Sequence, residues 1–343
     1  MRIRFKGPQL IMVLYLLVLF ICLIYLGLDC ITIINESLVK MVMNGVFVLA
    51  LIPMINTGIG MNFGLPIGIS AGLIGMLLAI QFRLTGFLGF MTAVIVGSLV
   101  AIIFGYIYAL LINRLKGNEE IVGIFAGLSF IPIMNIFYSG APFTNRQMLY
   151  PVGSKGLRPK INLENYFKGI LDNFMIINIG KVRIPFGMLL FYAMICLAIY
   201  LLFKSKLGVG MKAVAQNENF AKLSGIDINK TRTISVIVSM VIAAIGICVY
   251  SESYGFVQLY DGPLSVAFPT ISAILIGGAT RKKATVLNAI IGTYLFQTTF
   301  LISVPVANEF LIPQLSEITR MIVTNGILLY AFLYEGKNNS ESL

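Results

Sequence analysis

The sequence has no histidine and no tryptophan, and only 11% of its 343 residues carry charge. Histidine is the commonest metal ligand and the usual general base, so its absence removes the simplest routes to a metal centre and to acid–base catalysis. None of the cysteines forms a C-x-x-C pair, so there is no zinc or disulfide signature. We therefore predict that this chain holds no catalytic residue, no metal site and no cofactor. The cysteines are Cys22, Cys30, Cys196 and Cys248.

Charge is missing from long stretches as well as on average. No charged residue occurs between Lys40 and Arg83, or between Arg83 and Arg114. A membrane helix needs about 20 apolar residues, so these gaps have room for several. Hydrophobic residues make up 58% of the chain, more than a fold in water can bury. The composition predicts an all-α, polytopic membrane protein with a single transmembrane domain over residues 1–343.

The apolar segments predict about ten spans. The first follows a basic N-terminus and is too long for a signal peptide, so we interpret it as an uncleaved span. The predicted spans are residues 7–28, 38–57, 65–82, 86–112, 121–138, 184–203, 232–250, 265–279, 285–303 and 315–334.

The charges that remain are mostly basic, with a net charge of +11. Lys and Arg collect in alternate loops, at 114–116, 204–232 and 281–283, whereas Asp29, Glu36, Glu252, Asp261 and Glu309 lie in the others. Basic loops of membrane proteins face the cytoplasm, so we predict that both termini are cytoplasmic. The long loop 139–183 faces outward in this scheme although it is basic, and long loops report orientation weakly. No basic soluble domain is present, so we expect no nucleic-acid partner.

Two glycine-rich segments carry local predictions. Gly68, Gly72 and Gly75 share one face of the third span, which favours close helix packing. Residues 57–66 are too rich in Gly and Pro for a regular helix, yet they are uncharged. Irregular backbone at membrane depth needs protein or a water-filled cavity to satisfy its polar groups. Such breaks often flank transport sites.

The longest inward hydrophilic loop, residues 204–231, predicts one or two short amphipathic helices. Its apolar or small face is expected to hold Ala213, Ala215, Phe220, Ala221 and Leu223, and Gly225 is a plausible helix stop. A helix of this kind beneath a membrane bundle suits docking on a cytoplasmic partner.

This loop resembles the coupling segment of ABC importer permeases of the simple-sugar, nucleoside and branched-chain amino acid type. The matching positions are Gly208, Gly210, Ala213, Asn217, Ala221, Ser224, Gly225 and Ile226. Two further stretches are similar to that family, namely Asn62-Phe63-Gly64 and the run from Ile271 to Thr280. Met211 and Lys212 depart from the family pattern, which often has Arg there, and so point to a divergent branch.

The resemblance implies a type II ABC importer-like permease in a bacterial cytoplasmic membrane. A cytoplasmic ATPase subunit would bind ATP and Mg and push on the coupling loop. A second permease copy or a paralogue would complete the pore. An extracytoplasmic substrate-binding protein or lipoprotein would deliver the solute. The chain itself has no Gly-x-x-x-x-Gly-Lys-Ser/Thr loop, so it is not expected to be an enzyme.

Few polar residues lie inside the spans, and these are candidates for the substrate pathway or for helix–helix hydrogen bonds. The polar candidates are Asn56, Asn62, Asn135, Gln297 and Asn325, and Phe63, beside Asn62, is a further candidate for the substrate pathway. The scarcity of intramembrane charge favours a small neutral solute, a simple sugar or nucleoside first. Branched-chain amino acids or a vitamin are alternative solutes. An ion-coupled secondary transporter is the alternative mechanism, although it would be expected to carry intramembrane Asp, Glu or His.

Overall fold

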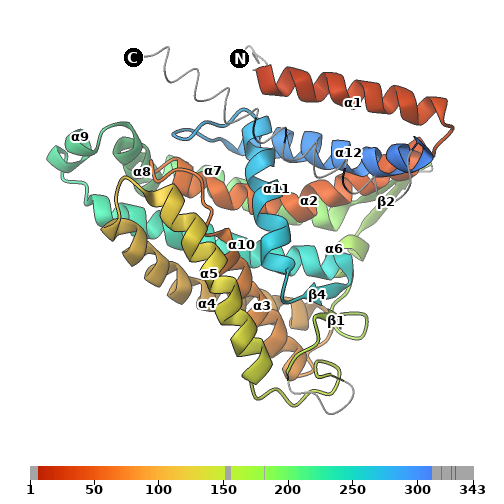
Figure 1. Cartoon of the computed structure of the whole chain (residues 1–343), viewed down its shortest axis with the longest axis horizontal. Helices are drawn as coiled ribbons and strands as arrows, with labels where there is room; N and C mark the ends of the chain where they lie inside the picture. The colour runs from red at the N-terminus through yellow and green to blue at the C-terminus, as the bar shows by residue number, and fades with distance from the viewer. Residues whose placement is uncertain are drawn as a thin grey trace.

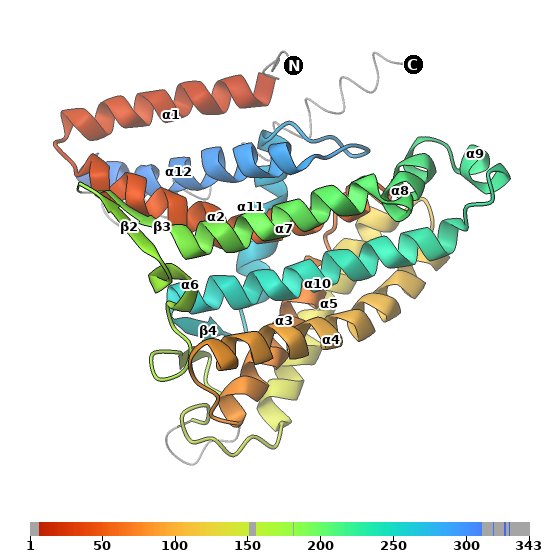
Figure 2. The ribbon, with the colours of Figure 1, turned by 180° about the vertical axis from the view of Figure 1, so that it is seen from behind.

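The computed structural model describes residues 7–150, 156–180 and 182–310, with the single residues 318, 326 and 329. These residues form a helical bundle in which α2, α10 and α12 run roughly parallel and α11 crosses them (Figure 1). From behind, α10 lies along α4, and α7 runs in nearly the same direction (Figure 2). The longer helices are α1 (Gly7–Tyr25), α2 (Cys30–Ile55), α3 (Leu65–Gln81), α4 (Gly86–Arg114), α5 (Glu119–Gly140), α7 (Phe186–Lys204), α10 (Ile228–Tyr254), α11 (Gly262–Ile276) and α12 (Val286–Phe310).

Six helices in the described part of the chain are long and apolar enough to cross a membrane. They are α2, α4, α5, α7, α10 and α12, and the shorter apolar helices are α1, α3 and α11. Each of these helices overlaps one of the first nine predicted spans. The tenth, at 315–334, lies outside the described residues, so the total of ten remains a prediction.

The second helix lies at the centre of the bundle. Of the most hydrophobic stretch of α2, 72% is buried, and α2 packs against α7, α10, α11 and α12. It begins at Cys30, eight residues before the predicted start, because Asp29 caps it. The Asp29 carboxylate accepts hydrogen bonds from the Ile31 amide at 3.0 Å and from the Thr32 hydroxyl at 2.6 Å.

The glycine stripe of α3 packs helices together, as predicted. A Cβ on Gly72 would lie 2.3 Å from Ile247 Cγ2 in α10. A Cβ on Gly75 would lie 2.5 Å from the Gly97 nitrogen in α4. Neither site has room for a side chain, so these glycines allow α3 to approach both neighbours closely.

The loops separate into two ends of the bundle, visible in both views (Figures 1 and 2). At one end, the strand end, β1 (Lys160–Asn162) pairs antiparallel with β4 (Phe256–Gln258), with Ile161 opposite Val257. The hairpin of β2 (Ile176–Ile179) and β3 (Val182–Pro185) and the short α6 (Ile170–Asn173) lie there too. The Arg183 amide also donates to Asn35 Oδ1 at 3.0 Å, and Asn35 lies between the first two predicted spans, in a loop predicted to face outward. The loop 139–183 therefore lies at the same end as the loops predicted to face outward.

Candidate functional site

The opposite end of the bundle carries α8 (Lys206–Gln216) and α9 (Glu218–Leu223), which confirms the prediction of short helices in the loop 204–231. Ser205 caps α8, and Asn217 caps α9 by accepting a hydrogen bond from the Phe220 amide at 3.0 Å. Gly225 adopts φ +77°, a left-handed conformation that favours glycine. It comes just after Ser224, the C-cap of α9, so the predicted helix stop is confirmed.

The helix α8 packs closely against the C-terminal end of α7. A Cβ on Gly208 would lie 2.3 Å from the Leu202 carbonyl oxygen, so only glycine fits there. Met211 and Val214 are buried against the bundle. Lys212 donates a hydrogen bond to the Phe203 carbonyl at 3.2 Å, satisfying a carbonyl at the end of α7. Gly210 has more room, because its Cβ would lie 3.8 Å from Ile226.

The apolar side chains of α9 point in two directions. Ala221 is fully buried, but Phe220 is 62% exposed and Leu223 is 89% exposed. The face predicted from the sequence therefore divides into a buried part and an exposed part, with Ala213 and Ala215 half-buried. Ser224 is exposed beside Leu223. An apolar tip of this kind is suited to contact with another protein.

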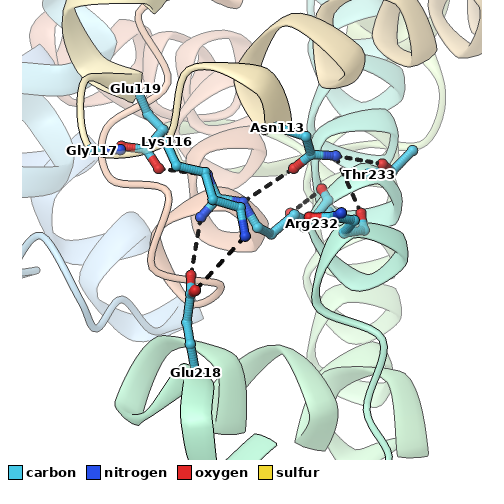
Figure 3. Close-up of polar contacts among 9 residues, drawn as sticks. Asn113, Lys116, Gly117, Glu119, Glu218, Arg232 and Thr233 are labelled. Atoms are coloured by element: carbon cyan, nitrogen blue, oxygen red, sulfur yellow. Dashed lines mark hydrogen bonds and ion pairs between the residues drawn. The ribbon is translucent and has the colours of Figure 1, made fainter. Parts of the chain in front are cut away.

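A buried arginine ties α9 to the membrane helices (Figure 3). Arg232, in the first turns of α10, is only 2% exposed. Its guanidinium lies 2.5 Å from Glu119 Oε1 at the start of α5 and 3.4 Å from Glu218 Oε1 in α9. Its Nε also donates to Asn113 Oδ1 in α4 at 3.2 Å. One side chain thus connects α4, α5, α9 and α10.

A second carboxylate extends these contacts across the same end. Glu120 lies 3.7 Å from Arg281, in the loop between α11 and α12, and accepts a long hydrogen bond from the Met61 amide at 3.4 Å. A Cβ on Gly58 would lie 3.0 Å from Ala215 Cα of α8. We call the set Glu119, Glu120, Glu218, Arg232 and Arg281 the charged seam.

Sequence reasoning did not identify this seam. Arg232 was assigned only to the end of the basic loop. The available signal was a lone arginine at the start of one apolar span and the adjacent acids Glu119 and Glu120 at the start of another. All three of the predicted inward loops meet at the seam, which confirms that they lie at one end.

The irregular segment between α2 and α3 is held by protein contacts. The Asn56 side chain donates to the Ala284 carbonyl at 2.8 Å and accepts from the Ala284 amide at 2.9 Å. The Asn62 amide group donates to Ser239 Oγ at 2.8 Å. Both side chains are buried. Each side chain therefore makes a packing hydrogen bond to a distant part of the chain, Asn56 to the loop between α11 and α12 and Asn62 to α10, the alternative that sequence reasoning weighed against pore lining.

The other pathway candidates are scattered. The Phe63 ring lies 6.4 Å from that of Phe268 and lines a shallow groove between α5 and α11. Asn135 is half-buried in α5. Gln297, in α12, lines a separate cavity at the strand end. Asn325 lies outside the described residues. The structure thus does not gather these residues into one site.

Comparisons with known proteins find a family and individual relatives. The family model described as "Branched-chain amino acid transport system / permease component" matches residues 33–333. The nucleoside ABC transporter permease protein NupC of Lactococcus lactis subsp. cremoris (strain MG1363) is 27% identical over 215 residues, which cover 59% of this chain and 64% of that relative. A solved inward-facing structure described as a metal-chelate type ABC transporter covers 95% of this chain and 99% of its own, with 15% identity and a TM-score of 0.47. Because the family match covers most of the chain, this protein belongs to the branched-chain amino acid transport system permease family of ABC transporters.

Proposed function

We propose that the chain is the permease subunit of an importer for a small neutral solute, driven by a separate ATPase subunit. The observation that carries the proposal is the exposed apolar tip of α9, joined through Glu218 and Arg232 to three membrane helices, α4, α5 and α10. A push on α9 would reach α4, α5 and α10 through contacts shorter than 3.5 Å. The chain itself would bind neither ATP nor Mg.

The charge pattern supports an orientation in a bacterial cytoplasmic membrane. The end with α8 and α9 holds the basic loops 204–232 and 281–283, and basic loops face the cytoplasm. In the proposed orientation, the ATPase contact and both termini lie on the cytoplasmic side. The strand end would then face an extracytoplasmic substrate-binding protein or lipoprotein.

A nucleoside or simple sugar is the proposed solute. The similarity to a nucleoside permease supports the nucleoside, and the scarcity of intramembrane charge supports a neutral compound. A second permease, identical or paralogous, would complete the pore. The groove between α5 and α11, with Phe63 and Phe268 on its walls, is the face we assign to that partner.

Uptake by proteoliposomes tests the mechanism. The vesicles hold the permease, its partner permease and the ATPase, and the binding protein delivers labelled solute from the opposite side of the membrane. They should accumulate this solute only when ATP is present on the side where the ATPase lies. Dissipating ion gradients should leave uptake intact. Uptake that follows a sodium or proton gradient without ATP would replace the proposal with the secondary-transporter alternative.

Two variants test the contact site. Leu223→Ala should weaken ATPase binding at least about tenfold, as expected for an apolar anchor at an interface. Leu88→Ala is the matched control, because Leu88 is also exposed, at 63%, but lies in the first turn of α4. Equal binding by both variants and the unmodified chain would reject α9 as the docking element.

A further inference from the structure

A cavity of about 610 Å³ lies at the strand end, away from the charged seam. Residues of α2, α10, α11 and α12 line it, together with Leu28 and Asp29 in the turn before α2. Binding sites for small molecules span about 300–1,000 Å³ and combine apolar walls with a few polar groups. The cavity has the size of such a site.

Aromatic rings from two helices line the cavity. Tyr250 and Tyr254 of α10 have ring centroids 4.9 Å apart. Phe296 and Phe300 of α12 have centroids 6.2 Å apart and stack at 27°. Aromatic faces of this kind bind flat rings, because each base of a nucleic acid has a π face that stacks on them.

One polar side chain in the cavity has no hydrogen-bond partner among the residues that the structure describes. Gln297 is 8% exposed and lines the cavity, and its amide makes no hydrogen bond to any part of the chain that the structure describes. The amide atoms of Gln297 are not among the fully buried polar atoms without a partner, so they are open to the cavity and can meet a ligand there. A ligand with adjacent donor and acceptor atoms would satisfy this amide, as the edge of a base does for Asn and Gln.

Charged groups lie at the outer part of the same cavity. Glu36 lines it on α2, and a carboxylate can accept hydrogen bonds from ribose hydroxyls. The Lys40 ammonium lies 4.0 Å from the centre of the Tyr254 ring and is held there by that contact. The cavity thus offers rings, an amide and a carboxylate to one ligand.

We propose that this cavity is a binding site for a nucleoside, with the base against the rings of α10 and α12, its edge on Gln297 and its ribose toward Glu36. The assignment deepens the proposed transport function and rests on it for its biological role. It locates solute recognition within one permease subunit, at the end that would receive solute from the binding protein.

The absence of tryptophan from the chain allows a direct test. Phe300→Trp creates a single tryptophan in the cavity, and the full-length permease in detergent micelles can be titrated with adenosine or uridine. We expect saturable quenching of its fluorescence, excited at a wavelength that tyrosine and nucleosides do not absorb. Phe87→Trp is the matched control, because Phe87 is 61% exposed in the first turn of α4. It should show no saturable quenching.

A second pair of substitutions tests the amide. In the Phe300→Trp background, Gln297→Ala should raise the nucleoside Kd at least about fivefold, the lower end for a bidentate amide–base contact. Thr298→Ala removes the neighbouring buried polar group, which does not line the cavity, and should leave the Kd unchanged within about twofold by the same scale.

Ribose and leucine complete the titrations. Saturation by ribose or leucine, and not by the nucleosides, would overturn the nucleoside assignment. Absence of quenching by every solute would overturn the site itself. ATP-driven nucleoside uptake without quenching would reject this cavity and leave the proposed function standing. Saturable quenching without ATP-driven uptake would support the cavity as a nucleoside site and reject the proposed transport function.

Discussion

Replacing Arg232 with methionine should destabilise the protein by about 3–5 kcal/mol, the cost of leaving a buried charge without its partner. The side chain of Arg232 is 3% exposed and that of Glu119 is 13% exposed. Without the guanidinium, the Glu119 carboxylate would keep, within the described part of the chain, only its hydrogen bond from the Gly117 amide. Asn113 Oδ1 would lose its donor as well.

Glu218 should matter much less for stability. Its side chain is 45% exposed and lies 3.4 Å from Arg232 and 3.8 Å from Lys116. Water screens such pairs, so Glu218→Gln should cost at most about 1 kcal/mol. If α9 drives the membrane helices through this contact, the same variant should transport less solute per ATP hydrolysed while the ATPase remains bound.

Equilibrium unfolding in mixed detergent micelles measures these costs. The double variant Arg232→Met with Glu119→Gln should recover much of the loss, since removing both charges of a buried pair is often close to neutral. A loss under about 1 kcal/mol for Arg232→Met, the scale of a surface ion pair, would refute the reasoning. Additive losses in the double variant would refute it too, because contacting groups are expected to couple.

Three further predictions concern other contacts. Gly208→Ala should lower the free energy of unfolding by about 1–3 kcal/mol and reduce ATP-dependent uptake, because its Cβ would overlap the Leu202 carbonyl. Gly210→Ala is the control and should be tolerated. Normal uptake by the Gly208 variant would contradict the tight packing of α8 against the end of α7. Asn56→Ala should destabilise by about 1–3 kcal/mol in an unfolding titration, because it leaves the Ala284 amide and carbonyl without partners, and Asn56→Asp should keep only the bond from that amide. Burial raises the pKa of Asp172 at the strand end, so ionisation of this carboxyl opposes folding. The free energy of unfolding should therefore fall as the pH rises through the folded-state pKa. Asp172→Asn should remove that part of the pH dependence, and a variant with the same pH profile as the unmodified chain would contradict this assignment.

The sequence by itself determined the membrane class and the positions of the helices. Scarce charge and long apolar runs are local properties, so the segment predicted at 86–112 needed only a short extension to give α4, Gly86–Arg114. The glycine stripe of α3 was equally readable, because helical spacing places Gly68 and Gly72 on one face. The stop at Gly225 followed from the conformational freedom of glycine alone.

Tertiary structure decided which distant residues meet. Arg232 and Glu119 are 113 positions apart, and Asn56 and Ala284 are 228 apart. Periodicity within a segment says nothing about its partner on another helix. The division of α9 into a buried and an exposed side was also beyond sequence reasoning, because its six residues complete too few turns to separate the buried Ala221 from the exposed Phe220. Gln297 lines its cavity only because α2, α10, α11 and α12 surround that space in the folded chain. Hydropathy acts along the chain, whereas ion pairs and cavities depend on packing between elements.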